Sequence, residues 1–471
     1  MKLYRITNFV IIALVITAIY QTQELWLEGT GGHNFFHAIF ESISIGDSPV
    51  DGDVLLATRY AIGEGEGTFS VYYPDDVGES ALLETANRAL GEIISQNDNI
   101  PAKSTADWKE ILKDRCIVMQ YDFMIASEEY LDYYKNLKSG QRLDRFDYIT
   151  IVPARRNGEK CMAYFVNSDT NECILLRADG GNASTALYQA LTTQKDGLLY
   201  VSTGQRTSAS VLWRNMFLPQ WASLPYEYAP LRQEFPFEWE GETSRTALEG
   251  AVKNFFRNFS MDWNDIDEEG IFTFSDSETV VKYHPEERVL EYFSYGNYGS
   301  EKQRISLLEG YQISCNFLRN DPSLQTDIYL ADMERTIHNE IVYYFDYVVN
   351  DLPVNLSQPV QDRIGCPHAI RVTLRNQAVK EYRRYAVNYK AAAEKSDRIN
   401  VQFIDALDDA NKTYQAVVED KAISDVKNIS LGYHVDLTGS IRLKWFVTLY
   451  DYTFVVDTEQ DSDLTAVSPM S

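Results

Sequence analysis

Near its start the chain carries an uncharged run, residues 6–23, that is apolar enough and long enough to cross a bilayer. As a helix these 18 residues rise roughly 27 Å, close to the thickness of the hydrocarbon layer. Lys2 and Arg5 precede the run, and Tyr20 and Trp26 stand at its far end, as interfacial aromatic residues do. We expect this segment to place the rest of the chain on one side of a membrane.

A cleaved signal peptide is the alternative interpretation of the same segment. Cleavage needs small residues just after the apolar core, and only residues 16–18 come close, with Ile16 a poor choice at its position. A lipoprotein would need a cysteine there, and none follows the run. The sequence therefore favours an uncleaved transmembrane helix.

Charge predicts the orientation of this helix and limits the partners of the chain. Because Lys2 and Arg5 precede the helix, the N-terminus is expected in the cytoplasm and the bulk of the chain outside it. We thus predict a single-pass protein of the cell membrane. The net charge of −26 excludes nucleic acid as the main partner and disfavours anionic lipid and wall polymers. Five cysteines without a C-x-x-C pair give neither a disulfide framework nor a zinc ribbon.

The residue patterns predict an α+β fold behind the transmembrane helix: a mixed α/β domain and two smaller helix-on-antiparallel-sheet modules. The predicted boundaries are 1–28 for the cytoplasmic stub and transmembrane helix, 29–240 for the mixed extracytoplasmic domain, 241–398 for the second module, 399–457 for the C-terminal module and 458–471 for an acidic disordered tail. Four prolines between residues 218 and 240 predict an extended connector there, because proline blocks long helices.

Helical stripes and alternating strands set the expected elements within these regions. The helices are expected at 80–95, 104–112, 244–259 and 401–417. The strands are expected at 117–124, 148–153, 161–167, 173–178, 270–275, 279–284, 289–295, 327–334, 340–350, 369–374, 378–389, 428–434 and 442–456. Phe255 and Phe256 should be buried against a sheet. Hairpin turns are expected at 168–171 and at 285–288. The first of these turns should keep Cys161 and Cys173 from standing opposite each other.

The search for catalytic or metal-binding residues returns incomplete patterns. His33 and His37 are spaced for a helix but have no third ligand, and the acidic run at 265–269 continues into a strand pattern, which does not suit a calcium loop. Ser424 and Lys427 match a short nucleophile motif without its companion motifs. We expect no catalytic residue, no metal site and no cofactor, and the sequence does not predict an enzyme.

Several short stretches nevertheless resemble the YycH/YycI family. They are Trp108 followed by 117–124, then Asp147-Tyr148-Ile149-Thr150-Ile151, Val280-Val281-Lys282-Tyr283 with Leu290-Glu291-Tyr292, and Leu431-Gly432-Tyr433 with Leu443-Lys444-Trp445-Phe446-Val447. The N-terminal helix and the exported modules match the layout of the same family. Length and the three-region layout are closer to YycH than to YycI.

The resemblance implies a non-enzymatic regulator of the WalK/WalR (YycG/YycF) two-component system of Gram-positive bacteria. Such proteins act on the sensor histidine kinase through transmembrane contacts, together with a second, YycI-like regulator, so a homo- or hetero-oligomer is possible. In this chain Ala13 and Thr17 are four residues apart and Ala18 lies beside them, which forms a patch of small side chains. These three residues are the predicted contact site, although the pattern also fits an ordinary lipid-facing helix.

Two other functions fit the same layout. An anchored binding module for a peptide or a cell-wall ligand would show a pocket lined by aromatic residues with few polar groups. A wall-active enzyme would show a cleft with paired carboxylates or a metal. The sequence alone does not decide whether a kinase would be activated or inhibited.

The first prediction is that the mature protein keeps its N-terminal helix. N-terminal sequencing of the protein purified from the membrane fraction should read from residue 1 or 2, because residues 16–18 make a poor cleavage site. A mature chain that begins near residue 19 would show instead that the segment is a cleaved signal.

Overall fold

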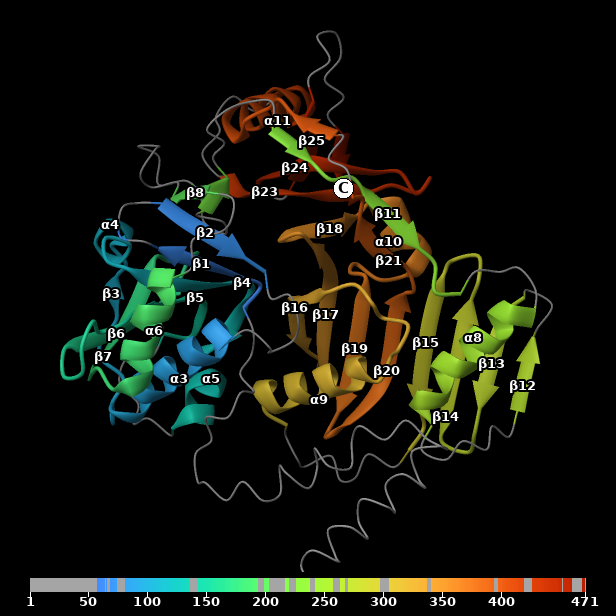
Figure 1. Cartoon of the computed structure of the whole chain (residues 1–471), viewed down its shortest axis with the longest axis horizontal. Coiled ribbons are helices and arrows are strands. Elements are labelled where there is room, and N and C mark those ends of the chain that lie inside the picture. Colours follow the sequence, from blue (N-terminus) through green and yellow to red (C-terminus); the bar gives the residue numbers. More distant parts are fainter. Residues whose placement is uncertain are drawn as a thin grey trace, which may run out of the picture. The chain divides into compact units, whose positions relative to one another are not determined.

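Two large, mainly antiparallel sheets organise the computed structural model of the chain (Figure 1). The structure describes residues 57–63, 65, 68–73, 81–135, 143–193, 199–202, 217–219, 226–237, 242–256, 263–266, 270–296, 305–336, 340–393, 397–418, 426–450, 452–459 and 468–470. They belong to one compact unit, Val50–Ser471. The predicted α+β class is confirmed for this unit.

The first sheet has nine strands in the order β3-β7-β6-β5-β4-β1-β2-β8-β9. Its strands are β1 (Arg59–Gly63), β2 (Thr68–Tyr72), β3 (Ser104–Thr105), β4 (Cys116–Ala126), β5 (Arg145–Val152), β6 (Lys160–Asn167), β7 (Glu172–Asp179), β8 (Leu199–Ser202) and β9 (Phe217–Pro219). Helices α3 (Ala81–Ser95), α5 (Ser127–Tyr134) and α6 (Asn182–Thr193) pack on one face, and α4 (Trp108–Ile111) packs on the other. The central strands β4 and β5 are therefore apolar on both faces.

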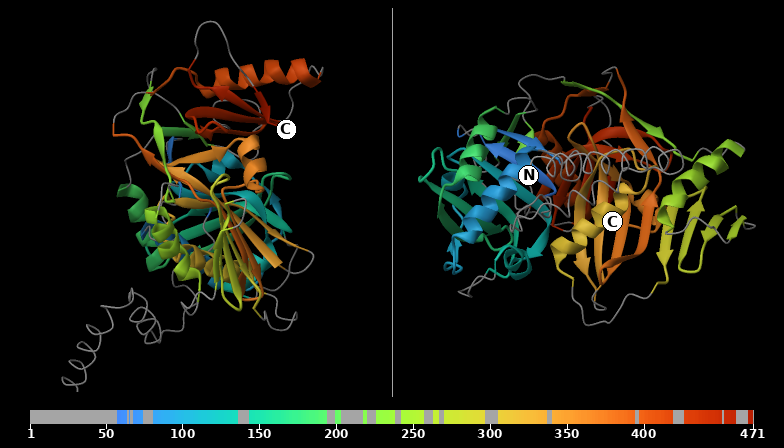
Figure 2. Two further views of the ribbon diagram at one scale, coloured as in Figure 1. Left: turned by 90° about the vertical axis from the view of Figure 1, so that its right-hand side faces the viewer. Right: turned by 60° about the horizontal axis from the view of Figure 1, so that its bottom comes forward.

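The second sheet has thirteen strands in the order β12-β13-β14-β15-β20-β19-β17-β18-β23-β24-β25-β26, with β16 paired to β17. Its strands are β12 (Trp263–Ile266), β13 (Phe272–Ser275), β14 (Thr279–His284), β15 (Val289–Ser294), β16 (Ile328–Arg335), β17 (Glu340–Val349), β18 (Leu352–Leu356), β19 (Ile370–Arg375), β20 (Ala378–Tyr385), β23 (Val426–Val435), β24 (Ile441–Leu449), β25 (Tyr452–Asp457) and β26 (Ser468–Met470). Its helices are α8 (Glu242–Val252), the 3-10 turn η1 (Lys253–Phe255), α9 (Leu307–Arg319), α10 (Gln358–Ile364) and α11 (Phe403–Val418). Figures 1 and 2 show α9 along β17, β19 and β20, and α11 across β24 and β25.

The two regions that the sequence separates at residue 398 share this sheet. β18 runs parallel to β23, with Val354 opposite Tyr433. Gly432 is required at this join because a Cβ there would lie 2.9 Å from the carbonyl oxygen of Pro353. The strands of the two predicted modules thus form one continuous sheet.

Within the proline-rich connector, the described residues 226–228 and 231–234 are extended strands, as the sequence predicts, and they are also paired. β10 (Tyr226–Tyr228) pairs with β22 (Asp397–Ile399), and β11 (Leu231–Glu234) pairs with β21 (Asn388–Ala391). The phenol of Tyr433 on β23 donates to the carbonyl of Ala229 at 3.0 Å. The connector therefore forms two small two-stranded sheets with β21 and β22, and hydrogen bonds from Tyr433 and from the backbone of Leu443 attach it to the second sheet.

Several predicted boundaries change. The helix expected at 104–112 is a short strand, β3, followed by α4, and the helix expected at 244–259 gives way to η1 and ends at Phe255. Phe256 has extended backbone dihedrals, φ −101° and ψ 135°, and both Phe255 and Phe256 are buried as expected. Helix α9 was not predicted, although Ser306 and Glu309 form a capping box at its start.

Two predicted strands are broken by turns. The strand expected at 442–456 is the hairpin β24–β25, and Tyr450 in its turn has φ 52°. The strand expected at 378–389 divides into β20 and β21. The hairpins expected at 168–171 and 285–288 are confirmed, and Cys161 pairs with Ala178 whereas Cys173 pairs with Val166.

Part of the predicted disordered tail is ordered. The carbonyl of Thr458 accepts the backbone N–H groups of Asn400 and Val401. β26 pairs with β25, with Ser468 opposite Val455. These contacts do not fit disorder at residues 458 and 468–470, and residues 460–467 lie outside the described residues.

A buried ion pair lies at the centre of the second sheet. The side chains of Arg384 on β20 and Asp321 after α9 are both fully buried, 2.8 Å apart. Arg384 also donates to Tyr347, Ser323 and Asn388. All the guanidinium nitrogens therefore have acceptors, as a buried arginine requires.

Neighbouring donors complete this network at Asp321. Burial raises the pKa of the Asp321 carboxyl, but Arg384, together with hydrogen bonds from Ser323 and Tyr382, outweighs burial and holds that pKa below its ordinary value. A lowered pKa in the folded state means that the ionised carboxylate stabilises the fold.

The second prediction concerns this network. Asp321→Asn should lower the free energy of unfolding by about 3–5 kcal/mol, because it leaves Arg384 buried without its counter-ion. Urea denaturation followed by tryptophan fluorescence measures the change. Glu234→Gln, in an exposed ion pair with Lys390, is the control and should change it by less than about 1 kcal/mol.

The wild-type protein should also lose the stabilisation by the ionised Asp321 carboxylate in acid. It is complete above about pH 4, the ordinary pKa of an aspartate, and it is lost as the pH falls through the lowered pKa of the folded state. Equal stability of Asp321→Asn and wild type at pH 7 would contradict this account of the network.

Candidate functional site

The predicted transmembrane contact residues Ala13, Thr17 and Ala18 lie outside the described residues. No helix within the described ranges is long and apolar enough to cross a membrane. The structure therefore leaves the predicted anchor and its contact site as predictions.

The incomplete chemical motifs stay incomplete where the structure describes them. Asp265 lies on β12, opposite Thr273 of the antiparallel strand β13, so this segment is a strand. His33, His37 and Ser424 are outside the described residues, and Lys427 lies on β23. Within the described ranges, no group of three or more His, Cys, Asp or Glu side chains is placed to hold a metal ion.

A polar junction joins the first sheet to the second. Arg59 on β1 forms an ion pair with Asp122 on β4 and donates to the phenol of Tyr73 at 3.2 Å. Tyr73 in turn packs edge-on against Tyr329 of β16, with ring centroids 5.1 Å apart. The hydroxyl of Thr58 donates to the carbonyl of Leu330 at 3.2 Å, so β16 is bound to the first sheet by polar and aromatic contacts together.

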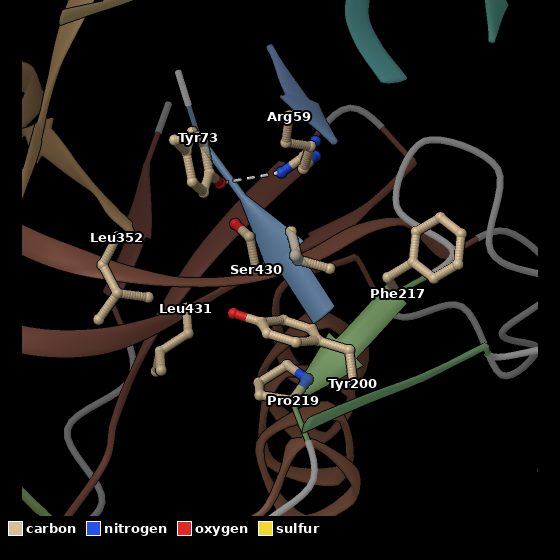
Figure 3. A pocket seen from close by; sticks show the side chains of 9 residues that line it. Arg59, Tyr73, Tyr200, Phe217, Pro219, Leu352, Ser430 and Leu431 are labelled. Carbon is tan, nitrogen blue, oxygen red and sulfur yellow. Dashed lines mark hydrogen bonds between the residues drawn. The ribbon is translucent and has the colours of Figure 1, made fainter. Parts of the chain in front are cut away.

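A small, partly open cavity of about 20 Å³ lies at the same junction (Figure 3). Its walls come from β1, β2, β8 and β9 of the first sheet and from β18 and β23 of the second. Arg59 is 4% exposed, and its Nε has no hydrogen-bond partner among the described residues. A volume of this size holds about one water molecule, which is too small for a ligand, so the cavity is a packing feature of the junction.

A larger groove, of about 570 Å³, lies on the second sheet where β15 and β20 stop pairing. We call it the aromatic groove. It is lined by Phe255, Asp276, Glu278, Thr279, Tyr292, Ser294, Gly296, Ile313, Asn316, Phe317, Asn320, Gln377, Ala378 and Val379. Its volume lies in the range of small-molecule and short-peptide sites.

Three aromatic rings form the apolar part of this groove. Phe255 of η1, Tyr292 of β15 and Phe317 of α9 contact one another, with ring centroids 5.0–5.8 Å apart. Tyr382 of β20 packs edge-on against Phe317 at 5.3 Å. Because Phe317 is only half-buried, part of this aromatic cluster faces the groove.

Carboxylates mark one side of the aromatic groove. Asp276 and Glu278 lie in the turn between β13 and β14, where Asp276 Oδ1 accepts the backbone N–H groups of Glu278 and Thr279 at 2.8 and 2.7 Å. The carbonyl of Glu278 accepts the N–H of Tyr295 at 2.7 Å, which attaches the turn to the end of β15. Glu278 is exposed, and its carboxylate has no ion-pair partner within the described part of the chain.

Sequence reasoning missed this groove. It predicted the burial of Phe255 and the hairpin that carries Tyr292, but it did not predict helix α9, which supplies Phe317. The capping box at Ser306 was a usable signal for that helix. The groove forms where η1, β15, α9 and β20 come together in space, and no local sequence pattern indicates that they do.

Comparisons with known proteins return matches among solved structures but not among family models or curated sequences. No protein-family model and no curated protein matches the sequence. Among solved structures, the chain is similar to YycH from Bacillus subtilis, with 12% identity and a TM-score of 0.46 over 89% of this chain and 96% of the other. This similarity is structural only.

Two other solved structures match more weakly. An uncharacterized protein from Eubacterium rectale has 11% identity and a TM-score of 0.32 over 52% of this chain and 82% of its own. The C-terminal domain of Bacillus megaterium YpeB has 12% identity and a TM-score of 0.25 over 49% of this chain and 98% of its own.

Proposed function

We propose that the chain is a membrane-anchored, non-enzymatic regulator of a sensor histidine kinase, with its bulk outside the cytoplasm. The observation that carries this proposal is the uncharged run at 6–23 behind Lys2 and Arg5, which fits one transmembrane helix. The four stretches that resemble the YycH/YycI family support the same function. A second, YycI-like regulator is the further partner that this resemblance implies.

Regulation would be carried by the transmembrane helix. Ala13 and Thr17, with Ala18 beside them, let another helix approach closely, because small side chains bring two backbones together. A regulator shifts a kinase between two signalling states only by contacting them differently, and about 1–3 kcal/mol of difference is enough.

The exported domains would act as a rigid holder for this contact. The Arg384 network fixes the centre of the second sheet, and the Arg59 junction attaches the first sheet to it. A partner bound to either sheet would therefore shift the whole exported unit between its conformational states. It would not act on one loop alone.

An anchored binding module for a peptide or wall ligand is the second candidate function. The aromatic groove favours it, since rings from three elements line a concave surface with few charged groups. The two functions are compatible, because a regulator can respond to a ligand bound outside the membrane.

The third prediction tests the transmembrane contact. Replacing Ala13 and Thr17 together with Leu should change expression of a response-regulator reporter about five-fold or more, because the larger side chains prevent close helix packing. Ile12→Leu with Ile16→Leu, also four residues apart and nearly equal in volume, is the matched control and should leave the reporter unchanged.

Protease resistance of the exported domains on intact cells shows whether the variants are folded and exported. Unchanged reporter expression at normal protein level would contradict regulation through this patch. It would favour the extracytoplasmic binding module instead.

A further inference from the structure

The aromatic groove coincides with an opening in the second sheet. The β15–β20 ladder ends at the pair Phe293 and Glu381. Beyond it, Ser294 still pairs with Thr279 on β14, and Ala378 still pairs with Arg375 on β19. Figure 1 shows β15 and β20 diverging at this end, where the described residues of the two strands no longer pair with each other.

Backbone groups along a strand edge without a partner are a template for another extended segment. Ser294 and Gly296 line one side of the aromatic groove, and Ala378 and Val379 line the other. An extended peptide that enters here can bond to the edge of β20 at Ala378 and Val379 while its side chains alternate between the groove and solvent.

The groove offers different chemistry to the two kinds of side chain. Half-buried Phe317, with Phe255 and Tyr292 behind it, provides an apolar surface. Tyr295 is 72% exposed and adjoins the groove at the end of β15. A single apolar side chain from a ligand could be buried against this cluster, with a gain of free energy from the area removed from water.

The charges favour a cationic ligand. Asp276 and Glu278 are the charged side chains among the described lining residues. Lys253 and Arg319 are near in sequence but do not line the groove, and Arg319 donates to Asn316 on its own helix. The net charge of −26 adds a long-range attraction for basic segments.

From these observations we propose that the aromatic groove binds an extended basic segment of a partner protein. The segment lies along the ends of β15 and β20, places an apolar side chain on the aromatic cluster, and places a Lys or Arg side chain at Glu278 and Asp276. This inference deepens the proposed function by naming the chemistry of a partner outside the membrane.

The experiment uses the full chain in a nonionic detergent and three fluorescein-labelled nonapeptides. The first alternates Lys with Leu and Phe, the second replaces each Lys with Glu, and the third keeps Lys but replaces the apolar residues with Ser. Fluorescence anisotropy should show binding of the first peptide and affinities at least about ten-fold weaker for the other two. Equal binding of the acidic peptide, or no binding of the first peptide at millimolar concentration, would overturn the proposal.

Three variants locate the binding. Glu278→Gln removes one exposed carboxylate and should lower the affinity for the first peptide about three- to ten-fold. The affinity of this variant should also depend less on salt concentration. Ala378→Lys places a cation at an exposed lining position and should lower the affinity for the first peptide further. Glu286→Gln, at the opposite end of the β14–β15 hairpin, is the matched control and should bind like wild type.

Unchanged affinity in both groove variants would overturn the site. Self-association of the chain that Ala378→Lys abolishes would also overturn the proposal, because the occupant would then be a second copy. Since Ala13 and Thr17 lie far along the chain from the groove, their replacement should not change peptide affinity. A failure of the kinase proposal is therefore distinguishable from a failure of the groove.

Discussion

The ion pair between Arg384 and Asp321 is the interaction on which the second sheet depends. Two opposite charges at 0% exposure are tolerated only when every remaining donor and acceptor is satisfied. Here the phenol of Tyr347 on β17, Ser323 after α9 and Asn388 at the start of β21 supply these partners. One side chain therefore fixes the relative positions of α9, β17, β20 and β21.

The same constraint determines where the aromatic groove can form. α9 ends at Arg319, two residues before Asp321, so the network places Phe317 above the sheet. β20 carries Tyr382, which packs on Phe317 and donates to Asp321 at 2.8 Å. The packed face of β20 is thus held in place, while its residues Ala378 and Val379 lie beyond the last β15–β20 pair and line the groove. A binding surface on rigid elements of this kind needs little rearrangement to accept a ligand.

Local sequence signals made several elements of both sheets predictable. The helical periodicity of apolar residues at 80–95 correctly predicts α3, and the turn residues at 168–171 and 285–288 correctly predict hairpins. Both kinds of signal are local, because periodicity and turn chemistry depend on a few neighbouring residues. Apart from Trp108 on α4, the stretches that resemble the YycH/YycI family lie on β4, β5, β14, β15, β23 and β24 and contain many core residues. They therefore carry information on the fold more than on a site. The parallel pairing of β18 with β23 and the convergence of Phe255, Tyr292 and Phe317 depend on distant segments, which no local pattern indicates.

The central claim is that the N-terminal helix contacts a sensor kinase in the membrane. Photo-crosslinking in living cells, from one photoreactive residue placed in turn at positions 10 to 18, tests it most directly. We expect capture of the sensor histidine kinase, strongest from the helix face that carries Ala13 and Thr17, with weak capture from the opposite face. Capture of no kinase from any of these positions, in protein that is exported and abundant, would contradict the claim.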